Sequence, residues 1–180
     1  GVRILVTAGP TREEIDPVRY LSNHSSGKMG YAIARSAAAR GADVTLISGP
    51  VALDEPIGVR TLQIASAQEM QQALMERYGD SDVVIKAAAV ADYRPAQKAQ
   101  QKIKKNSKEL SLQLEKNPDL LAELGQCKKK QILVGFAAET ENLLENASAK
   151  LKKKKLDMIV ANDVTAEGAG FGSETNLVNF

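Results

Sequence analysis

The feature that most constrains the fold is a series of short apolar runs that alternate with segments of helical pattern. Seven runs are predicted to be strands, at residues 3–9, 42–49, 59–65, 82–90, 131–138, 156–163 and 175–180. Helices are predicted at 26–41, at 66–78, after 117–119 and at 140–154. Runs that are apolar throughout are typical of parallel strands covered by helices on both faces. The chain is therefore predicted to form a Rossmann-like, doubly wound α/β domain with a mainly parallel sheet.

Composition indicates one ordinary globular domain over residues 1–180. The chain is 43% hydrophobic and 26% charged, and its length suffices for one full core. No apolar run approaches the roughly 20 residues that span a bilayer, so no membrane partner is expected. The single cysteine, Cys127, cannot form an internal disulfide, which favours a cytoplasmic location. Because Gly1 leads at once into a strand without a charged leader, we expect a domain cut from a longer polypeptide.

Lysines are clustered although the net charge is only +2. Residues 98–108 hold five lysines and no acid, and further clusters lie at 128–130 and 150–155. Such clusters are explained either by solvated surfaces or by arms that close on a polyanionic substrate. Aromatic residues make up 4% of the chain, too few for a surface that stacks on bases, so no nucleic-acid partner is expected.

Four polar segments follow predicted strands, at 8–30, 88–95, 135–140 and 161–172. In doubly wound sheets, ligands bind beyond the carboxyl ends of the strands, so these segments are expected to share one edge. In the first segment, Ser25 and Ser26 are candidate N-caps, and Gly27 and Gly30 lie on one face of the helix. This start suits an anion such as phosphate, but capping and close helix packing explain it equally well. The length of the preceding connection favours a functional role.

Four motifs in order along the chain resemble those of bacterial phosphopantothenoylcysteine synthetases. They are "SNHSSGKMG" at 22–30, "AAVADYRP" at 88–95, "KIKK" at 102–105 and "GFAAET" at 135–140. The resemblance covers nearly the whole chain. It implies a ligase that activates 4'-phosphopantothenate with CTP as an acyl-cytidylate and then joins it to cysteine, releasing pyrophosphate and CMP. It also implies Mg2+ bound with the nucleotide, a homodimer, and a phosphopantothenoylcysteine decarboxylase domain elsewhere in the full-length protein.

The resemblance also assigns roles to residues. Lys102 is implied to be catalytic, on a mobile arm at about 96–108 that closes over the substrates, and Asn23 to hold the substrate carbonyl. No catalytic role is assigned to His24, and Lys152 and Lys153 are expected to be solvated. Residues at the substrate or its phosphate are Asn23, His24, Ser25, Ser26, Gly27 and Gly30. Residues at the nucleotide are Lys86, Ala87, Ala88, Ala89, Asp92, Lys102, Pro118, Asp119, Leu120, Leu121, Phe136, Lys150 and Lys154.

Motifs also bear on metal sites and on two other function classes. No His/Cys group has zinc spacing, and no residue is named as a metal ligand because Mg2+ binds mainly through substrate phosphates. A dinucleotide-dependent reductase would need a G-x-G-x-x-G turn after the first strand, where this chain has "AGPTRE". A nonenzymatic nucleotide-binding module that uses the lysine clusters is the other alternative. In such a module, replacing any of many lysines with alanine should weaken binding, and the loss should grow with salt concentration.

Overall fold

The computed structural model describes residues 1–104, 109–139, 143–163 and 175–180. Its core is a seven-stranded sheet with the order β11-β10-β9-β6-β1-β4-β5. All neighbours pair in parallel except β11, which is antiparallel to β10. This order is that of a doubly wound sheet, so the predicted fold class is confirmed. The strands are β1 (Arg3–Ala8), β4 (Asp43–Ser48), β5 (Val59–Gln63), β6 (Val83–Lys86), β9 (Ile132–Glu139), β10 (Met158–Asp163) and β11 (Val178–Asn179).

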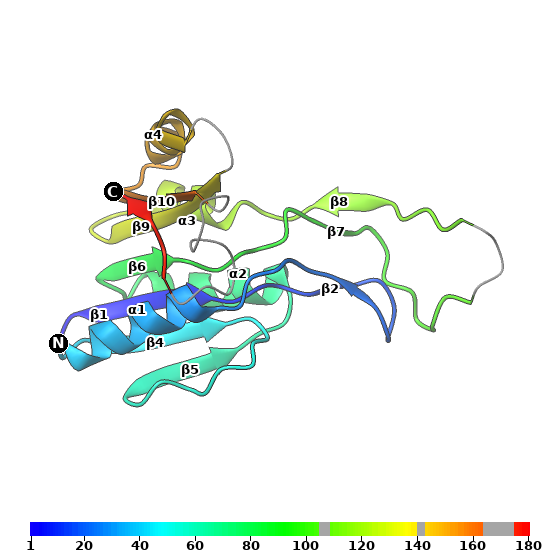
Figure 1. Cartoon of the computed structure of the whole chain (residues 1–180), viewed down its shortest axis with the longest axis horizontal. Coiled ribbons are helices and arrows are strands. Elements are labelled where there is room, and N and C mark those ends of the chain that lie inside the picture. Colours follow the sequence, from blue (N-terminus) through cyan, green and yellow to red (C-terminus); the bar gives the residue numbers. More distant parts are fainter. Residues whose placement is uncertain (105–108, 140–142, 164–174) are drawn as a thin grey trace.

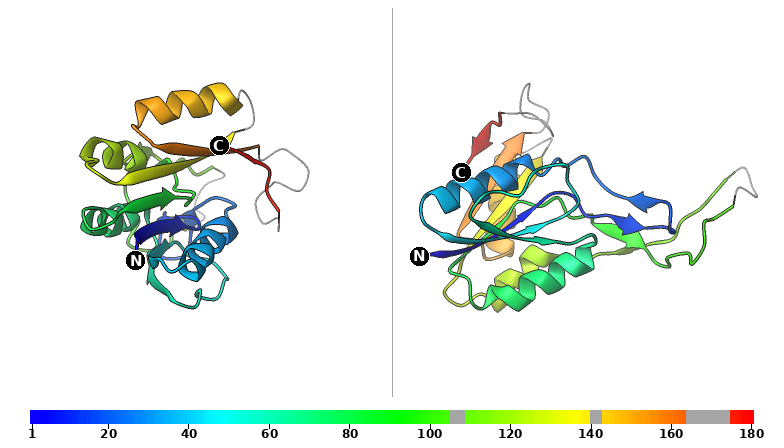
Figure 2. Two further views of the ribbon diagram at one scale, coloured as in Figure 1. Left: turned by 90° about the vertical axis from the view of Figure 1, so that its left-hand side faces the viewer. Right: turned by 90° about the horizontal axis from the view of Figure 1, so that it is seen from below.

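Helices cover both faces of the sheet (Figure 2). On one face α1 (Lys28–Ala39) packs through Tyr31 and Ala34 onto Val6 and Leu46. The larger apolar cluster, on the other face, joins α2 (Ala67–Tyr78), α3 (Leu120–Cys127) and α4 (Leu143–Lys153) to the sheet. The topological switch point therefore lies between β1 and β6, whose outgoing connections run to opposite faces.

Helix starts differ in how well local sequence predicted them. Ser66 caps α2, and its Oγ accepts from the amide of Glu69 at 3.2 Å, which is one half of a capping box. The Glu69 side chain accepts from the amide of Ala65 at 2.7 Å, not from the amide of Ser66 as a full capping box requires. At α3 the N-cap is Asp119, so the helix begins directly after residues 117–119 as predicted, and Pro118 precedes the cap. At α1 the expectation that Ser25 or Ser26 is the N-cap is wrong. Gly27 holds that position with φ of 80°, a backbone conformation that glycine adopts readily.

Two antiparallel ribbons project beyond the carboxyl edge of the sheet (Figure 1). One pairs β2 (Glu13–Glu14) with β3 (Tyr20–Leu21), and the other pairs β7 (Tyr93–Pro95) with β8 (Leu114–Lys116). The second ribbon contains the predicted arm, of which residues 105–108 lie outside the described residues, as does most of the polar segment at 161–172. No helix in the described ranges is long and apolar enough to cross a membrane.

Candidate functional site

The loops that follow β1 and β6 are joined by hydrogen bonds at the switch point. The amide of Ala88 donates to Thr7 Oγ1 at 3.1 Å, and that of Ala89 donates to the Gly9 carbonyl at 2.9 Å. The carbonyl of Ala89 accepts from the amide of Thr11 at 3.3 Å. The loops after β1 and β6 are therefore bonded to each other, and these backbone groups of Ala88 and Ala89 already have partners.

Asn23 connects the polar loop before α1 to the same point. Its Nδ2 donates to the carbonyl of Ala89 at 2.6 Å, and its Oδ1 accepts from the amide of Ser25 at 3.0 Å. The second contact is an Asx turn. These contacts use the side-chain oxygen and one of the two amide hydrogens, while the neighbouring His24 is exposed. Asn23 thus lies where the loops after β1 and β6 meet.

The glycines at the start of α1 face protein atoms. A Cβ added to Gly30 would lie 2.5 Å from Ala8 Cβ, and one added to Gly27 would lie 2.8 Å from Val51 Cγ1. Ser26 Oγ lies 3.5 Å from the amide of Lys28, at the limit of a hydrogen bond. Of the two explanations for these glycines, close packing of the helix on β1 accounts for the geometry. Phosphate binding at this helix start stays a prediction.

A pocket of about 370 Å³ opens beside the switch point, at the end of β6 and the starts of α3 and β7. Its wall brings together nine of the residues that were predicted to contact the nucleotide. They are Lys86, Asp92, Pro118, Asp119, Leu120, Leu121, Phe136, Lys150 and Lys154. It also includes residues that sequence reasoning missed: Val90, Ala91, Tyr93, Lys116, Asn117 and Ile159. Four predicted residues do not line it, namely Ala87, Ala88, Ala89 and Lys102.

Four lysines line this pocket, Lys116 from β8 and three others from the ends of β6 and α4. Burial, reinforced by the positive charge of Lys154, lowers the pKa of Lys86 to about 8, and its Nζ donates to the Ala88 carbonyl at 3.2 Å. Lys150 and Lys154 are four residues apart and reach the pocket from the end of α4. A lysine with a depressed pKa in a cleft beside other cations indicates a site for an anion.

Asp119 links this cationic wall to the start of α3. Its carboxylate caps the helix by accepting from the amide of Ala122 at 3.1 Å and pairs with Lys154 Nζ at 3.0 Å. Burial alone would raise the pKa of Asp119, but the hydrogen bonds from Lys154 and Ala122 lower it overall. The carboxylate therefore stays charged at neutral pH and fixes one lysine against the helix start.

Asn117 lines the pocket and was not predicted from the sequence. Its Nδ2 donates to the Ala91 carbonyl at 2.8 Å, and its Oδ1 accepts from Arg94 Nη1 at 2.8 Å. Its amide donates to the Asp92 carbonyl at 2.8 Å. Asn117 thereby joins the turn after β6 to the start of α3. The signal in the sequence was an Asn two residues before a helix N-cap, directly ahead of Pro118.

Lys102 lies on the arm, and its side chain is exposed. The backbone around it is attached to the β2–β3 ribbon, because the Ala99 amide donates to the Ile15 carbonyl at 2.9 Å. The structure therefore gathers nine of the thirteen predicted nucleotide residues in one pocket and places the predicted catalytic lysine outside it.

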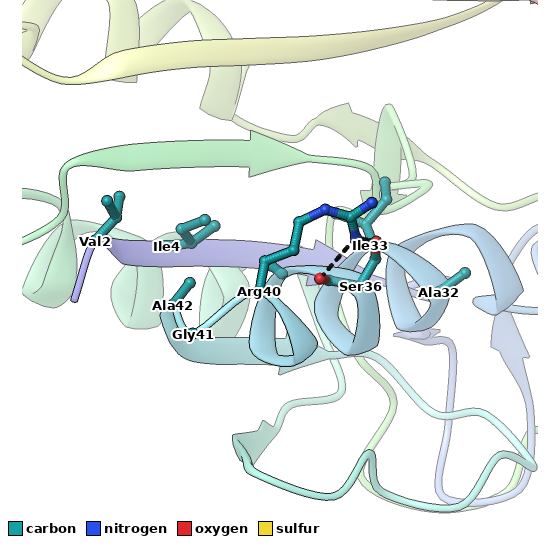
Figure 3. Close-up of a pocket in the computed structure, with 9 residues that line it drawn as sticks. Val2, Ile4, Ala32, Ile33, Ser36, Arg40, Gly41 and Ala42 are labelled. Carbon is teal, nitrogen blue, oxygen red and sulfur yellow. Dashed lines mark hydrogen bonds between the residues drawn. The ribbon is translucent and has the colours of Figure 1, made fainter.

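A larger hollow, of about 640 Å³, lies at the amino end of β1, at the opposite edge of the sheet (Figure 3). Its lining is mostly apolar and comes from β1 and the last turns of α1. Its one charged side chain, Arg40, donates from Nη1 to the Ser36 carbonyl at 3.0 Å. No convergent set of charged groups faces this hollow, so the candidate site is the basic pocket at the carboxyl edge.

The fold and the pocket define a doubly wound α/β domain with a basic site at the carboxyl edge of its sheet. The chain belongs to the family described as the DNA/pantothenate metabolism flavoprotein C-terminal domain, which matches residues 1–180. It is 53% identical to the coenzyme A biosynthesis bifunctional protein CoaBC of Bacillus subtilis over 179 residues, which is 99% of this chain and 44% of the relative. The chain thus spans less than half the length of such relatives.

One solved structure supports the same family, and a more distant one shares the fold. The crystal structure of the C-terminal domain of a CoaBC protein is 54% identical, with a TM-score of 0.82, over 91% of this chain and 78% of that one. A Cab2 variant in complex with phosphopantothenate-cysteine shares the fold at 17% identity and a TM-score of 0.76, over 88% of this chain and 71% of that one.

Proposed function

We propose that this chain is a ligase domain that joins 4'-phosphopantothenate to cysteine with CTP, in coenzyme A biosynthesis. The observation that carries the proposal is the basic pocket, which brings nine predicted nucleotide residues from separate elements onto one wall. The names of the CoaBC relatives and the ligand of the distant Cab2 structure support the pathway and the substrate class.

The proposed reaction has two steps. In the first, the carboxylate of 4'-phosphopantothenate attacks the α-phosphorus of CTP, an acyl–oxygen–phosphorus link forms, and pyrophosphate leaves. In the second, the amine of cysteine attacks the acyl carbon, the amide bond forms, CMP leaves with the electron pair of the broken bond, and the amine loses a proton. Both steps bring anionic groups together, so positive potential and positioning are the main requirements.

The pocket residues suit the first step. Lys86, Lys150 and Lys154 would neutralise the triphosphate, and the amides at the start of α3 would add positive potential. Phe136 would supply apolar contact for the base. Mg2+ would arrive with the nucleotide, because Mg2+ binds mainly through substrate phosphates.

Asn23 and Lys102 are proposed to serve the reacting groups. Hydrogen bonds with Ala89 and Ser25 fix Asn23 at the junction of the two loops. The second hydrogen of its Nδ2 would donate to the substrate carbonyl from this fixed position. Lys102 lies outside the pocket and would approach the phosphates when the arm at about 96–108 closes over bound substrates together with the β2–β3 ribbon to which it is bonded.

The domain is further proposed to act as a cytoplasmic homodimer alongside a phosphopantothenoylcysteine decarboxylase domain. Support for the second domain is the length of the relatives, which are described as bifunctional and of which this chain covers 44%. Support for the dimer comes from the exposed apolar side chains on the two ribbons.

The decisive measurement is pyrophosphate release with 4'-phosphopantothenate and Mg2+, comparing CTP with ATP, with and without cysteine. We expect release with CTP that continues only when cysteine is added. Lys154→Ala should weaken CTP binding by about tenfold or more because it removes a pocket cation, whereas Lys152→Ala on the exposed side of α4 is the matched control. No release with either nucleotide from folded protein would refute the ligase, and equal losses for both lysines would favour a charge-driven binding module.

A further inference from the structure

Asp16 is a fully buried carboxylate outside the pocket, in the loop that joins β2 to β3. Its Oδ1 accepts from the amides of Val18 and Arg19, each at 2.9 Å. These contacts form the Asx turn expected of an Asp-Pro pair. They account for one carboxylate oxygen and leave the role of the other to be explained.

Oδ2 of Asp16 holds a different part of the chain. It accepts from the amide of Ile103 at 3.1 Å and from Arg19 Nε at 3.1 Å. Arg19 Nη2 donates both to Oδ2 at 2.5 Å and to the carbonyl of Ile103 at 3.0 Å. The Asp16–Arg19 pair therefore binds the backbone amide and the backbone carbonyl of one residue, and that residue directly follows Lys102.

This attachment differs from an ordinary surface ion pair. The hydrogen bond from Arg19 holds the pKa of Asp16 far below its usual range, against the opposing effect of burial, and the amides of Ile103, Val18 and Arg19 add to it. Charge-assisted hydrogen bonds are about twice as strong as neutral ones. The same two segments are also joined by an ion pair between Lys98 and Glu14, whose side chains are 57% and 52% exposed. Ion pairs this exposed contribute little to stability.

We propose that Asp16 is a positioning residue for Lys102. By holding both peptide groups of Ile103, directly and through Arg19, it fixes the backbone from which the Lys102 side chain extends. The inference rests on the proposed role of Lys102 in the ligase reaction. A purely structural role would require only the turn contacts of Oδ1, and these involve no residue of the arm.

The first test needs no substrate. Hydrogen exchange of the Ile103 amide is compared in the wild-type protein, Asp16→Asn and the matched control Glu14→Gln. We expect Asp16→Asn to lower protection of that amide about tenfold to hundredfold, because a neutral amide replaces an ionised acceptor and turns a donor toward other donors. Glu14→Gln should leave the protection unchanged. Equal protection in all three proteins would overturn the proposal.

The second test is kinetic. Asp16→Asn should lower kcat for cysteine-dependent pyrophosphate release about tenfold or more while KM for CTP changes less than about twofold, because the pocket is untouched. Lys102→Ala should cost less in the Asp16→Asn background than alone, since the two changes affect one interaction. If Asp16→Asn does not fold, Arg19→Lys is the second variant, which keeps the turn and removes the fork that reaches the Ile103 carbonyl.

The outcomes separate this inference from the proposed function. Wild-type protein without turnover would overturn the ligase and this inference with it. Normal wild-type turnover together with unchanged kcat in Asp16→Asn, or fully additive losses with Lys102→Ala, would overturn the positioning role alone.

Discussion

Lys86 ends β6 with its ammonium group in the wall of the pocket. Burial disfavours the charged form, and the charges of Lys154 and Lys150 add to this, so its pKa falls from 10.5 to about 8. The unfolded chain therefore binds more protons than the folded chain between about pH 8 and 10.5. The cost of burying charged Lys86 is fully present below pH 8 and declines as the pH rises through that window. A bound polyanion would offset this cost.

Binding of CTP is accordingly predicted to draw a proton onto Lys86. At pH 9, with a pKa of about 8, about nine-tenths of the free protein carries neutral Lys86. Triphosphate charge nearby favours the ammonium form, so up to about one proton should be taken up per CTP bound. Calorimetric titration in two buffers of different ionisation enthalpy measures this number directly.

Lys86→Met is the control for proton uptake, since it keeps the stem and removes the titrating group. The variant should take up no proton at pH 9, and at pH 7, where Lys86 is already mostly charged, the two proteins should differ little. Equal uptake by wild type and variant at pH 9 would place the proton elsewhere and contradict the assignment.

At the scale of elements, the pocket depends on how α3 and α4 meet. Gly125 of α3 packs directly against the end of α4, where an added Cβ would lie 2.0 Å from the carbonyl oxygen of Lys154. The same lysine pairs with Asp119 at the start of α3. One glycine thus permits the close approach that holds a cation against the helix N-terminus.

Gly125→Ala is predicted to destabilise the fold by about 1–3 kcal/mol, because a backbone carbonyl cannot move aside as a flexible side chain can. It should also weaken CTP binding, since α3 and Lys154 must separate. Gly79→Ala is the control, because Gly79 has φ of −60° and open space around it, so it should be neutral or stabilising by about 0.4–1 kcal/mol. The midpoints of urea unfolding of the two variants measure this difference. Equal midpoints would show that the backbone at Lys154 moves aside without a cost in stability.

The elements that the sequence predicted well are those whose signal is local. Apolar runs marked every strand of the main sheet, and the Ser66–Glu69 spacing marked the start of α2. The start of α1 was placed too early because serine is a common cap, whereas the close approach of Gly27 to Val51 is decided by tertiary packing.

The site was predictable only in part, for the same reason. The pocket residues were found through family motifs, and the four predicted residues that do not line it include Ala88 and Ala89, whose backbones bind other loops. The contact of Asp16 with Ile103 joins residues 87 positions apart and leaves no periodic pattern. Pairings of this kind emerge only once the chain has folded.

On the scale of the whole molecule, the two ribbons at the carboxyl edge carry unusually exposed apolar side chains. They are Val18, Tyr20, Tyr93, Leu110 and Leu114, each between 44% and 60% exposed. Two-stranded ribbons are marginally stable alone in water, and apolar patches of this sort mark interaction surfaces. A second copy of the chain that covers the ribbons would remove this surface from water. It would also restrict the motion of the arm that carries Lys102.

The protein is therefore predicted to be a homodimer through its two ribbons, with a mass by light scattering of twice the 19.3 kDa of the chain. Leu114→Arg on β8 should weaken the dimer at least about tenfold, because association would bury an unpaired guanidinium. Ile57→Arg is the control, since Ile57 is 98% exposed in the loop before β5, on the sheet domain and away from the ribbons. Circular dichroism establishes that both variants are folded. A wild-type monomer at micromolar concentration, or equal dimerisation of the two variants, would contradict an interface on the ribbons.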